Sequence, residues 1–115
     1  KIIEMTVFIL QCGAQLAVQK RGAKVILAGL YQYPNLEQKM TAAEALRTAE
    51  AWGCMPTGLQ RQSEYKHIFT HVEWHMTGYY ITCSCEADGP AHDWIWADAA
   101  QMEAEIPLPS AFQYF

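Results

Sequence analysis

The hydrophobic pattern at the start of the chain predicts a β-hairpin. In the segment MTVFILQCGAQLAVQKRG, two apolar, β-rich runs flank Cys12-Gly13-Ala14. Glycine accepts the backbone conformations that a tight turn requires, so the two runs are expected to pair as antiparallel strands. The following segment, KVILAGLYQYPN, contains Gly29 and Pro34, which argue against a long helix there.

A helix is predicted after Thr41. Thr41-Ala42-Ala43-Glu44 matches a capping box, in which the threonine side chain accepts from the first turn and the glutamate reaches back. Gly53 suits the residue that ends the helix. The apolar face is formed at three- and four-residue steps by Ala42, Ala45, Leu46, Ala49 and Trp52. We expect this face to pack on a sheet; an exposed helix that binds a partner is the alternative.

The second half of the chain is dominated by strand patterns. YKHIFTHVEWHM (residues 65–76) alternates with period two and is predicted to be one strand, and GYYITCSC (residues 78–85) to be another. DGPAHD predicts a turn, DWIW a strand and ADAAQMEAEI a short helix, while Pro107 and Pro109 interrupt the tail. These elements predict a mixed α/β domain with no internal repeat.

Three histidines four residues apart, His67, His71 and His75, raise the question of a metal site. Residues four apart are about 6 Å apart along a helix but about 13 Å apart along a strand. Because the alternation favours a strand, two of these histidines are not expected to hold one metal ion. Two interpretations remain: the polar face of a half-buried strand, or a strand end that faces a ligand.

Composition limits the class of protein. The chain has 115 residues, of which 51% are hydrophobic, and it contains neither an apolar run long enough to cross a bilayer nor a signal peptide. These features predict one soluble, cytoplasmic domain over residues 1–115 that makes no membrane contact. The net charge of −4 argues against a free-standing domain that binds nucleic acid by charge alone. It leaves open a domain that contacts DNA beside a more basic neighbour.

The cysteines and the motif search identify no active site. The four cysteines lack the paired spacing of zinc sites, so reduced, buried thiols are expected at Cys12, Cys54, Cys83 and Cys85. The chain contains no G-x-S-x-G nucleophile motif, P-loop or G-x-G-x-x-G motif. Residue spacing alone therefore predicts neither a catalytic residue nor a metal ligand.

Four segments in order carry a resemblance to a known family. LAGLYQYPNL, HIFTHVEWHM, WIWADAAQMEAE and IPLPSAF together resemble the C-terminal domain of the A/G-specific adenine DNA glycosylases. The resemblance covers nearly the whole chain. It implies a Nudix-like fold of the α/β (α+β) class, in which a mixed β-sheet is sandwiched between helices.

The same resemblance bears on hydrolase chemistry. Nudix hydrolases use a helix with the pattern R-E-U-x-E-E-x-G-U, whose carboxylates hold the Mg²⁺ ions that bridge phosphates. The matching stretch here, Leu46 to Cys54, retains one of these carboxylates, Glu50. We therefore expect no hydrolysis of nucleoside triphosphates. A stand-alone Nudix-type nucleotide pyrophosphohydrolase with an unusual metal site is the alternative, and a protein-interaction domain is a third possibility.

In the glycosylases, a Phe-Ser-His motif at the tip of a strand contacts 8-oxoguanine paired with adenine. The matching residues are Phe69, Thr70 and His71, with threonine in place of the usual serine. A hydroxyl can accept from the N7–H of the oxidised base, a donor that guanine lacks. Phe69 would press on a base, and His71 would donate to a phosphate or base edge. Without the resemblance, Phe69 would be interpreted as a core aromatic and His71 as a surface residue.

The resemblance also implies partners. Lys20, Arg21 and Lys66 are the candidates for DNA phosphate contacts, whereas His67 and His75 are expected to be structural or solvated. The partners implied are duplex DNA that contains 8-oxoguanine·adenine and the glycosylase's own N-terminal catalytic domain. That catalytic domain, with a four-iron four-sulfur cluster, is expected before Lys1. No cofactor is expected in residues 1–115, and the protein is expected to be a monomer.

Overall fold

A mixed β-sheet of seven strands forms the centre of the computed structural model, which describes residues 1–115. The sheet order is β3-β2-β1-β6-β5, with β4 paired to β1 and β7 paired to β2. β1 and β6 run parallel from Ile2 opposite Glu73 to Gln11 opposite Thr82, and the other pairs are antiparallel. The strands are β1 (Ile2–Cys12), β2 (Gln15–Lys20), β3 (Tyr31–Gln32), β4 (Asn35–Leu36), β5 (Pro56–Ile68), β6 (Glu73–Cys83) and β7 (Ile95–Ala97).

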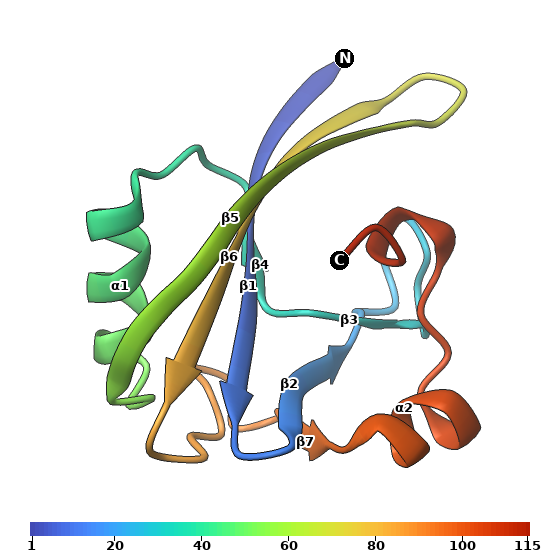
Figure 1. The fold of residues 1–115 in the computed structure, drawn as a ribbon. Coiled ribbons are helices and arrows are strands. Elements are labelled where there is room, and N and C mark those ends of the chain that lie inside the picture. Colours follow the sequence, from blue (N-terminus) through green and yellow to red (C-terminus); the bar gives the residue numbers. More distant parts are fainter.

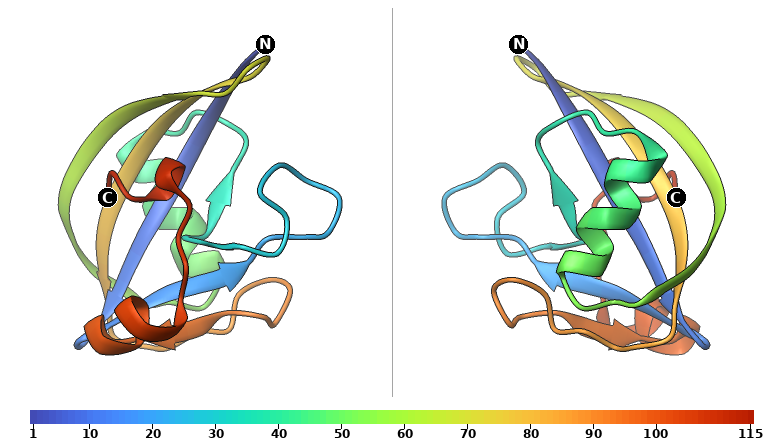
Figure 2. Two further views of the ribbon diagram at one scale, coloured as in Figure 1. Left: turned by 90° about the vertical axis from the view of Figure 1, so that its right-hand side faces the viewer. Right: turned by 90° about the vertical axis from the view of Figure 1, so that its left-hand side faces the viewer.

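Two α-helices and a short 3-10 helix cover the two faces of the sheet. They are α1 (Ala42–Ala51), α2 (Ala99–Glu105) and η1 (Ser110–Phe112). α1 lies on one side of the long strands, and α2, η1 and the C-terminus lie on the other (Figures 1 and 2). The predicted fold class, a mixed sheet between helices, is therefore confirmed. Neither α-helix has the length and apolar character needed to span a bilayer.

The central strand β1 is buried on both faces, which divides the hydrophobic core in two. Phe8 and Leu10 point to the α1 face, where they pack with Ile81. Val7 and Ile9 point to the other face, where they pack in the cluster that includes Phe112. A continuous apolar run suits such a strand, because neighbouring residues alternate between two buried faces.

The predicted β1–β2 hairpin is confirmed. Cys12 pairs with Gln15, so Gly13 and Ala14 form the turn, and Gly13 has a φ of 60°. The left-handed conformation is easily adopted by glycine because it has no Cβ.

The predicted α1 helix is also confirmed at both ends. Thr41 accepts from the backbone N–H of Glu44, and the Glu44 side chain accepts from the backbone N–H of Thr41. Gly53 has a φ of 92°, and Cys54 N–H donates to Ala49 O at 3.1 Å, as in a Schellman motif. Ala45 and Ala49 are buried against the sheet, so the apolar face packs internally as expected.

The expectation of one strand over residues 65–76 is wrong. β5 ends at Ile68, β6 begins at Glu73, and these two residues pair across the turn 69–72. Phe69 N–H donates to Val72 O at 2.7 Å and closes this turn. The turn contains no glycine, proline or asparagine. The polar–apolar alternation therefore runs through it without the usual sequence signal.

This turn also changes where the histidines point. His67 pairs with Trp74 and Lys66 pairs with His75, so His67 and His75 lie on opposite faces of the hairpin. The shared face expected from a single strand is therefore wrong for these two residues. Toward the end of the chain, β7 and α2 confirm the strand and short helix predicted there, and Asp98 caps α2.

Candidate functional site

The β5–β6 hairpin carries the candidate residues Phe69, Thr70 and His71 at its tip. The hairpin is the longest projection of the sheet, and its tip extends beyond the body of the molecule beside the start of β1 (Figure 1). Thr70 and His71 are exposed, whereas Phe69 is half-buried. All three line a shallow hollow of about 350 Å³, to which Ile2 and Ile68 contribute apolar walls. The tip therefore presents a hydroxyl and an imidazole to solvent on an apolar support.

Phe69 is held by aromatic contacts. Its ring meets the Trp74 ring edge-to-face with centroids 4.8 Å apart, and it meets the His67 ring at 4.7 Å. Aromatic pairs of this geometry add stability beyond the area they bury. Phe69 thus anchors the turn to the core, and only part of its ring remains available to a ligand.

The aromatic support continues along the hairpin to the C-terminal residues. His67 Nδ1 lies 3.0 Å from the hydroxyl of Tyr114, and Tyr114 stacks on Tyr65 with centroids 5.1 Å apart. Tyr65 also meets Phe115 edge-to-face at 5.0 Å. His67 is therefore a structural residue, as expected. The part played by Tyr114 was not predicted, and the only sequence signal for it is the aromatic ending of AFQYF.

The three cationic candidates lie in different surroundings. Lys20 is exposed at the end of β2, and Lys66 is exposed and pairs with Glu73 at 3.4 Å. Arg21 is engaged internally: its guanidinium lies 5.2 Å from the Trp74 ring centroid, and its Nε donates to Ile26 O at 2.7 Å. Burial lowers the pKa of Arg21.

Arg21 also contacts the side-chain oxygen of Gln32. A DNA phosphate would have to compete with all of these contacts, so Lys20 and Lys66 are better placed for that role than Arg21.

Glu73 and His75 form a polar pair at the base of the tip. Glu73 Oε1 lies 2.7 Å from His75 Nε2. The hydrogen bond from His75, followed by the contact with Lys66, lowers the pKa of Glu73 and keeps it ionised. His75 is therefore structural, as predicted from the sequence.

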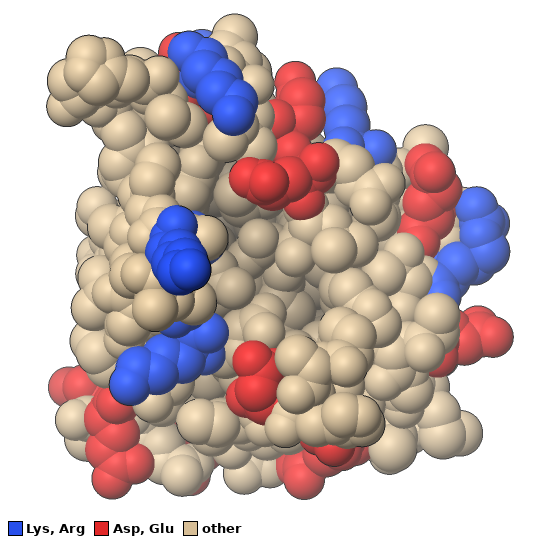
Figure 3. Space-filling view, turned by 180° about the vertical axis from the view of Figure 1, so that it is seen from behind, with Lys and Arg blue, Asp and Glu red and all other residues tan.

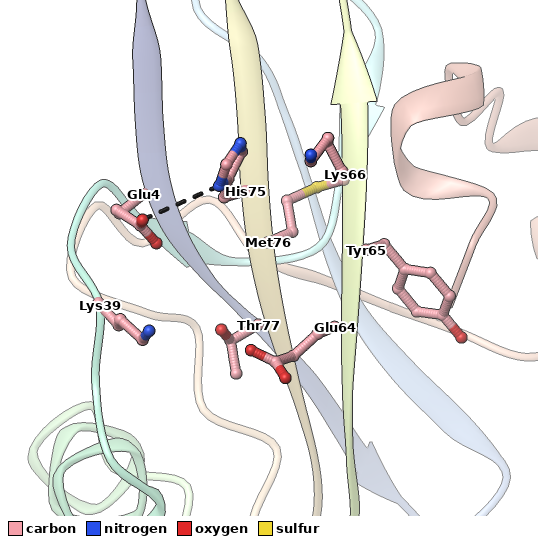
Figure 4. A pocket seen from close by; sticks show the side chains of 8 residues that line it. All are labelled: Glu4, Lys39, Glu64, Tyr65, Lys66, His75, Met76 and Thr77. Atoms are coloured by element: carbon pink, nitrogen blue, oxygen red, sulfur yellow. Dashed lines mark ion pairs between the residues drawn. The ribbon is translucent and has the colours of Figure 1, made fainter.

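A polar cleft of about 330 Å³ lies next to this pair, between β1, β5, β6 and the loop before α1. In Figure 4, Glu4 and His75 face each other, and His75 Nδ1 lies 4.0 Å from Glu4 Oε1. Acidic and basic side chains alternate around the cleft, which is lined by Glu4, Lys39, Glu64, Tyr65, Lys66, His75, Met76 and Thr77. The nearby lysines would compete with a metal ion for the glutamate carboxylates, so the cleft is poorly suited to bind a metal ion.

The α1 helix offers few carboxylates for the Mg²⁺ ions that Nudix chemistry requires. Glu44 is occupied in the capping box, and Glu50 is exposed near the end of the helix. No group of three or more His, Cys, Asp or Glu side chains in the structure is arranged to hold a metal ion. The residues present therefore do not fit the metal cluster of the hydrolase pattern.

Charge is dispersed over the face of the molecule that lies behind the view of Figure 1. In Figure 3, Lys and Arg are interleaved with Asp and Glu, and no single-sign patch covers this face. The projecting end at the upper left of that view is mostly uncharged. This face therefore provides no broad positive field, and DNA bound to it would be held by a few contacts.

The comparisons with known proteins agree on the fold. A family model described as NUDIX domain matches residues 6–115. A search of the curated proteins found no match. Among solved structures, the Nudix hydrolase RenU from M. smegmatis superposes with a TM-score of 0.67 at 17% identity, covering 96% of this chain and 79% of RenU.

Two other solved structures share this fold, one described as a hydrolase and one as the C-terminal domain of a larger protein. The MutT Nudix hydrolase from Burkholderia pseudomallei has a TM-score of 0.67 at 13% identity, covering 99% of this chain and 95% of that one. The C-terminal domain of mouse MUTYH, solved in complex with human PCNA, has a TM-score of 0.64 at 15% identity, covering 96% and 82%. Identities this low support the fold alone. Because the family match spans almost the entire sequence, this chain belongs to the Nudix domain family.

Proposed function

We propose that this Nudix domain is the lesion-recognition module of an adenine DNA glycosylase. In this role it contacts 8-oxoguanine opposite adenine in duplex DNA through Phe69, Thr70 and His71. The observation that carries the proposal is the exposure of Thr70 and His71 at the tip of a projecting hairpin, beside an anchored Phe69. The parent protein would excise the mispaired adenine with a separate N-terminal catalytic domain that contains a four-iron four-sulfur cluster.

The chemistry of the tip suits an oxidised purine. The Thr70 hydroxyl can accept from the N7–H of 8-oxoguanine, a position at which guanine offers only an acceptor. His71 can donate to a phosphate oxygen or a base edge, and the exposed part of Phe69 can press on a base. Lys20 and Lys66 are then the phosphate contacts, and Arg21 supports Trp74 beneath the tip.

The loss of carboxylates from the hydrolase positions of α1 supports the same proposal. A domain whose α1 retains only Glu50 at the hydrolase positions has little means of assembling the metal cluster, whereas lesion recognition requires no metal in this domain. The C-terminal domain of mouse MUTYH has the same fold, which is compatible with the proposal.

The test is to titrate the domain with duplexes that contain either 8-oxoguanine·adenine or guanine·adenine, while amide resonances are followed by NMR. We expect the largest shifts at residues 69–72, weak binding overall, and an affinity that falls as salt rises. Shifts centred on the α2 side, or tight binding that is insensitive to salt, would contradict the proposal.

A second candidate is a stand-alone nucleotide pyrophosphohydrolase. It is favoured by the hydrolase structures among the neighbours and by an apolar hollow of about 350 Å³ beside α2, lined in part by Tyr33, Tyr80 and Phe115. Such a hollow could hold a nucleobase.

Assays of normal and oxidised dGTP with Mg²⁺ separate the two candidates. We expect no turnover, because Glu50 alone provides too few ligands. Turnover that is abolished by Glu50→Gln and retained by the exposed control Glu103→Gln would favour the pyrophosphohydrolase over the lesion-recognition module.

A further inference from the structure

β5 forms a long, unpaired edge of the sheet. It stands at the end of the sheet order, and its only partner strand is β6. In both views of Figure 2, β5 forms the outer margin of the molecule, with no other strand beyond it. Its ladder with β6 is regular from Arg61, opposite Tyr80, to Ile68, opposite Glu73, and both register shifts lie before this stretch. Such an uninterrupted edge is a template on which another strand can pair.

Two hydrogen bonds show which backbone groups of β5 face outward. Phe69 N–H donates to Val72 O at 2.7 Å across the turn, and Glu73 N–H donates to Lys1 O at 2.8 Å on the β1 side of β6. In an antiparallel pair, the backbone groups of successive residues point alternately toward the partner strand and away from it. The odd-numbered residues of the regular stretch therefore bond to β6. The N–H and C=O groups that face outward belong to Gln62, Glu64, Lys66 and Ile68.

The side chains on this edge include one acid and one base, two positions apart. Glu64 and Lys66 are exposed and lie on the same face of the strand. Lys66 reaches Glu73 of its own chain at 3.4 Å, whereas Glu64 has no ion-pair partner. Charges on a strand edge usually oppose pairing with another chain. They favour it when the second strand brings an opposite charge to each position.

A second copy of β5 meets this condition in one antiparallel register. When the two strands are centred on Tyr65, Glu64 of each copy lies opposite Lys66 of the other. Both residues have outward backbone groups, so they form a hydrogen-bonded pair. Centring on Glu64 would instead place two carboxylates opposite each other, and centring on Lys66 would place two ammonium groups there. Charge therefore selects the register centred on Tyr65.

The other face of the strand is compatible with the same register. The two copies of Tyr65 would lie opposite each other as a non-hydrogen-bonded pair, in which side chains approach most closely. Aromatic pairs at such positions stabilise a sheet. Tyr65 is already supported by Tyr114, which stacks on it with ring centroids 5.1 Å apart. Ile68, which is 68% exposed, would be covered in part by Gln62 of the other copy.

We propose that this domain forms a symmetric homodimer in which residues 62–68 of two β5 strands pair antiparallel and join the two sheets into one. Gln62 pairs with Ile68 and Glu64 pairs with Lys66, each twice, which gives about eight backbone hydrogen bonds between the copies. The turn 69–72 lies outside the paired stretch, so the tip of each copy stays exposed. This dimer replaces the monomer expected from the sequence, and it does not depend on the proposed function.

Sedimentation equilibrium of the purified domain tests the dimer. Over a range of about 10 μM to about 1 mM, the mean mass should rise from one chain toward two. NMR measurements of amide hydrogen exchange at the two ends of this range locate the contact. The amides of residues 62, 64, 66 and 68 should exchange more slowly in the concentrated sample. Those of residues 63, 65 and 67, which bond to β6, should be protected in both samples.

Charge exchange tests the register. Glu64→Lys and Lys66→Glu each place like charges opposite one another, so each should weaken the dimer by about tenfold or more. An equal mixture of the two variants should form a heterodimer, because one copy then carries two bases and the other two acids. Glu103→Lys and Lys24→Glu are matched controls at exposed positions far from the edge in sequence. They make the same changes in net charge and should leave the affinity unchanged.

Several results would overturn the proposal. The first is a mass of one chain at the highest concentration, in which case the edge is solvated or pairs with an extended segment of another protein. The second is a dimer that Glu64→Lys and Lys66→Glu leave unchanged, or slowed exchange confined to amides outside residues 62–68. The third is a mixture of the two variants that stays monomeric while both melt as folded domains by circular dichroism.

Discussion

The two ends of β6 differ in how far the side chains around them are exposed to solvent. At its start, the turn 69–72 projects into solvent, and the neighbouring Ile68 is 68% exposed. At its other end, under α1, Ile81 is 1% exposed and Cys83 is buried. One hairpin therefore has a tip whose side chains are free for a ligand and a base whose side chains form the core. Substitutions at the tip should alter binding, and those at the base should alter stability.

The largest contrast is expected from the matched pair Ile81→Ala and Ile68→Ala. The buried Ile81 loses its packing and leaves a cavity, which should lower the free energy of unfolding by about 3 kcal/mol. The exposed Ile68 should change it by less than about 0.5 kcal/mol. Urea unfolding of both variants measures the difference, and equal losses would mean that the tip is packed as tightly as the base.

Substitutions of two glycines near the base of the hairpin should also differ in their cost to stability. Gly89 has a φ of 78°, and a Cβ there would lie 2.4 Å from Trp94 Cε2, so Gly89→Ala should cost about 2 to 3 kcal/mol. Gly13 has a φ of 60° with no atom within 4 Å of such a Cβ, so Gly13→Ala should cost only about 1 kcal/mol. Thermal unfolding compares the two. A reversed order would show that the loop around Trp94 relaxes easily.

At the tip, Thr70→Ala should act on binding rather than folding. We expect the preference for the 8-oxoguanine·adenine duplex over the guanine·adenine duplex to fall by about 1 to 2 kcal/mol, the value of one hydrogen bond, with the melting temperature unchanged. Thr70→Ser should be nearly silent because it keeps the hydroxyl. Thr57→Ala is the matched control, since Thr57 is exposed at the opposite end of β5.

The ratio of the two dissociation constants measures the effect of Thr70. An unchanged ratio together with a lower melting temperature would remove Thr70 from the recognition site and assign it to packing.

The smallest effect is expected from the polar pair at the start of β6. The hydrogen bond from His75, and then Lys66, lower the pKa of Glu73. A depressed carboxyl pKa stabilises the fold above the ordinary glutamate range, and that contribution is lost as the pH falls through the folded-state pKa. NMR titration should show the Glu73 pKa rising more in His75→Gln than in Lys66→Gln. The reverse order would make Lys66 the main partner.

Local sequence signals predicted most of the elements. The capping box at Thr41, the glycine that ends α1, and the β1–β2 hairpin depend on residues within a few positions of one another, so they can be recognised without the fold. The turn at 69–72 was missed because it is closed by a backbone hydrogen bond between Phe69 and Val72 and has no characteristic turn residue. A turn closed by backbone atoms can be formed by many residue types, so the sequence carries no signal for it.

The candidate site was only partly predictable, because several of its contacts join residues that are far apart in the sequence. The resemblance indicated Phe69, Thr70 and His71, and their exposure follows from the hairpin that projects them. It also indicated Arg21, whose contacts with Trp74 and Ile26 O turn it inward. The support from Tyr114 depends on the C-terminal residues folding back onto β5, a contact across 47 positions of the chain.

By itself, the sequence determined the helix and its caps, the strand-rich pattern and the single retained carboxylate Glu50 at the hydrolase positions of α1. Only the tertiary structure decided that His67 and His75 face opposite ways and that Cys54 and Cys83 join the same core cluster under α1. The physical reason is that caps and periodicity are properties of neighbouring residues. Strand register, in contrast, is set by packing of the whole sheet, and a shift of one residue reverses the face of every side chain.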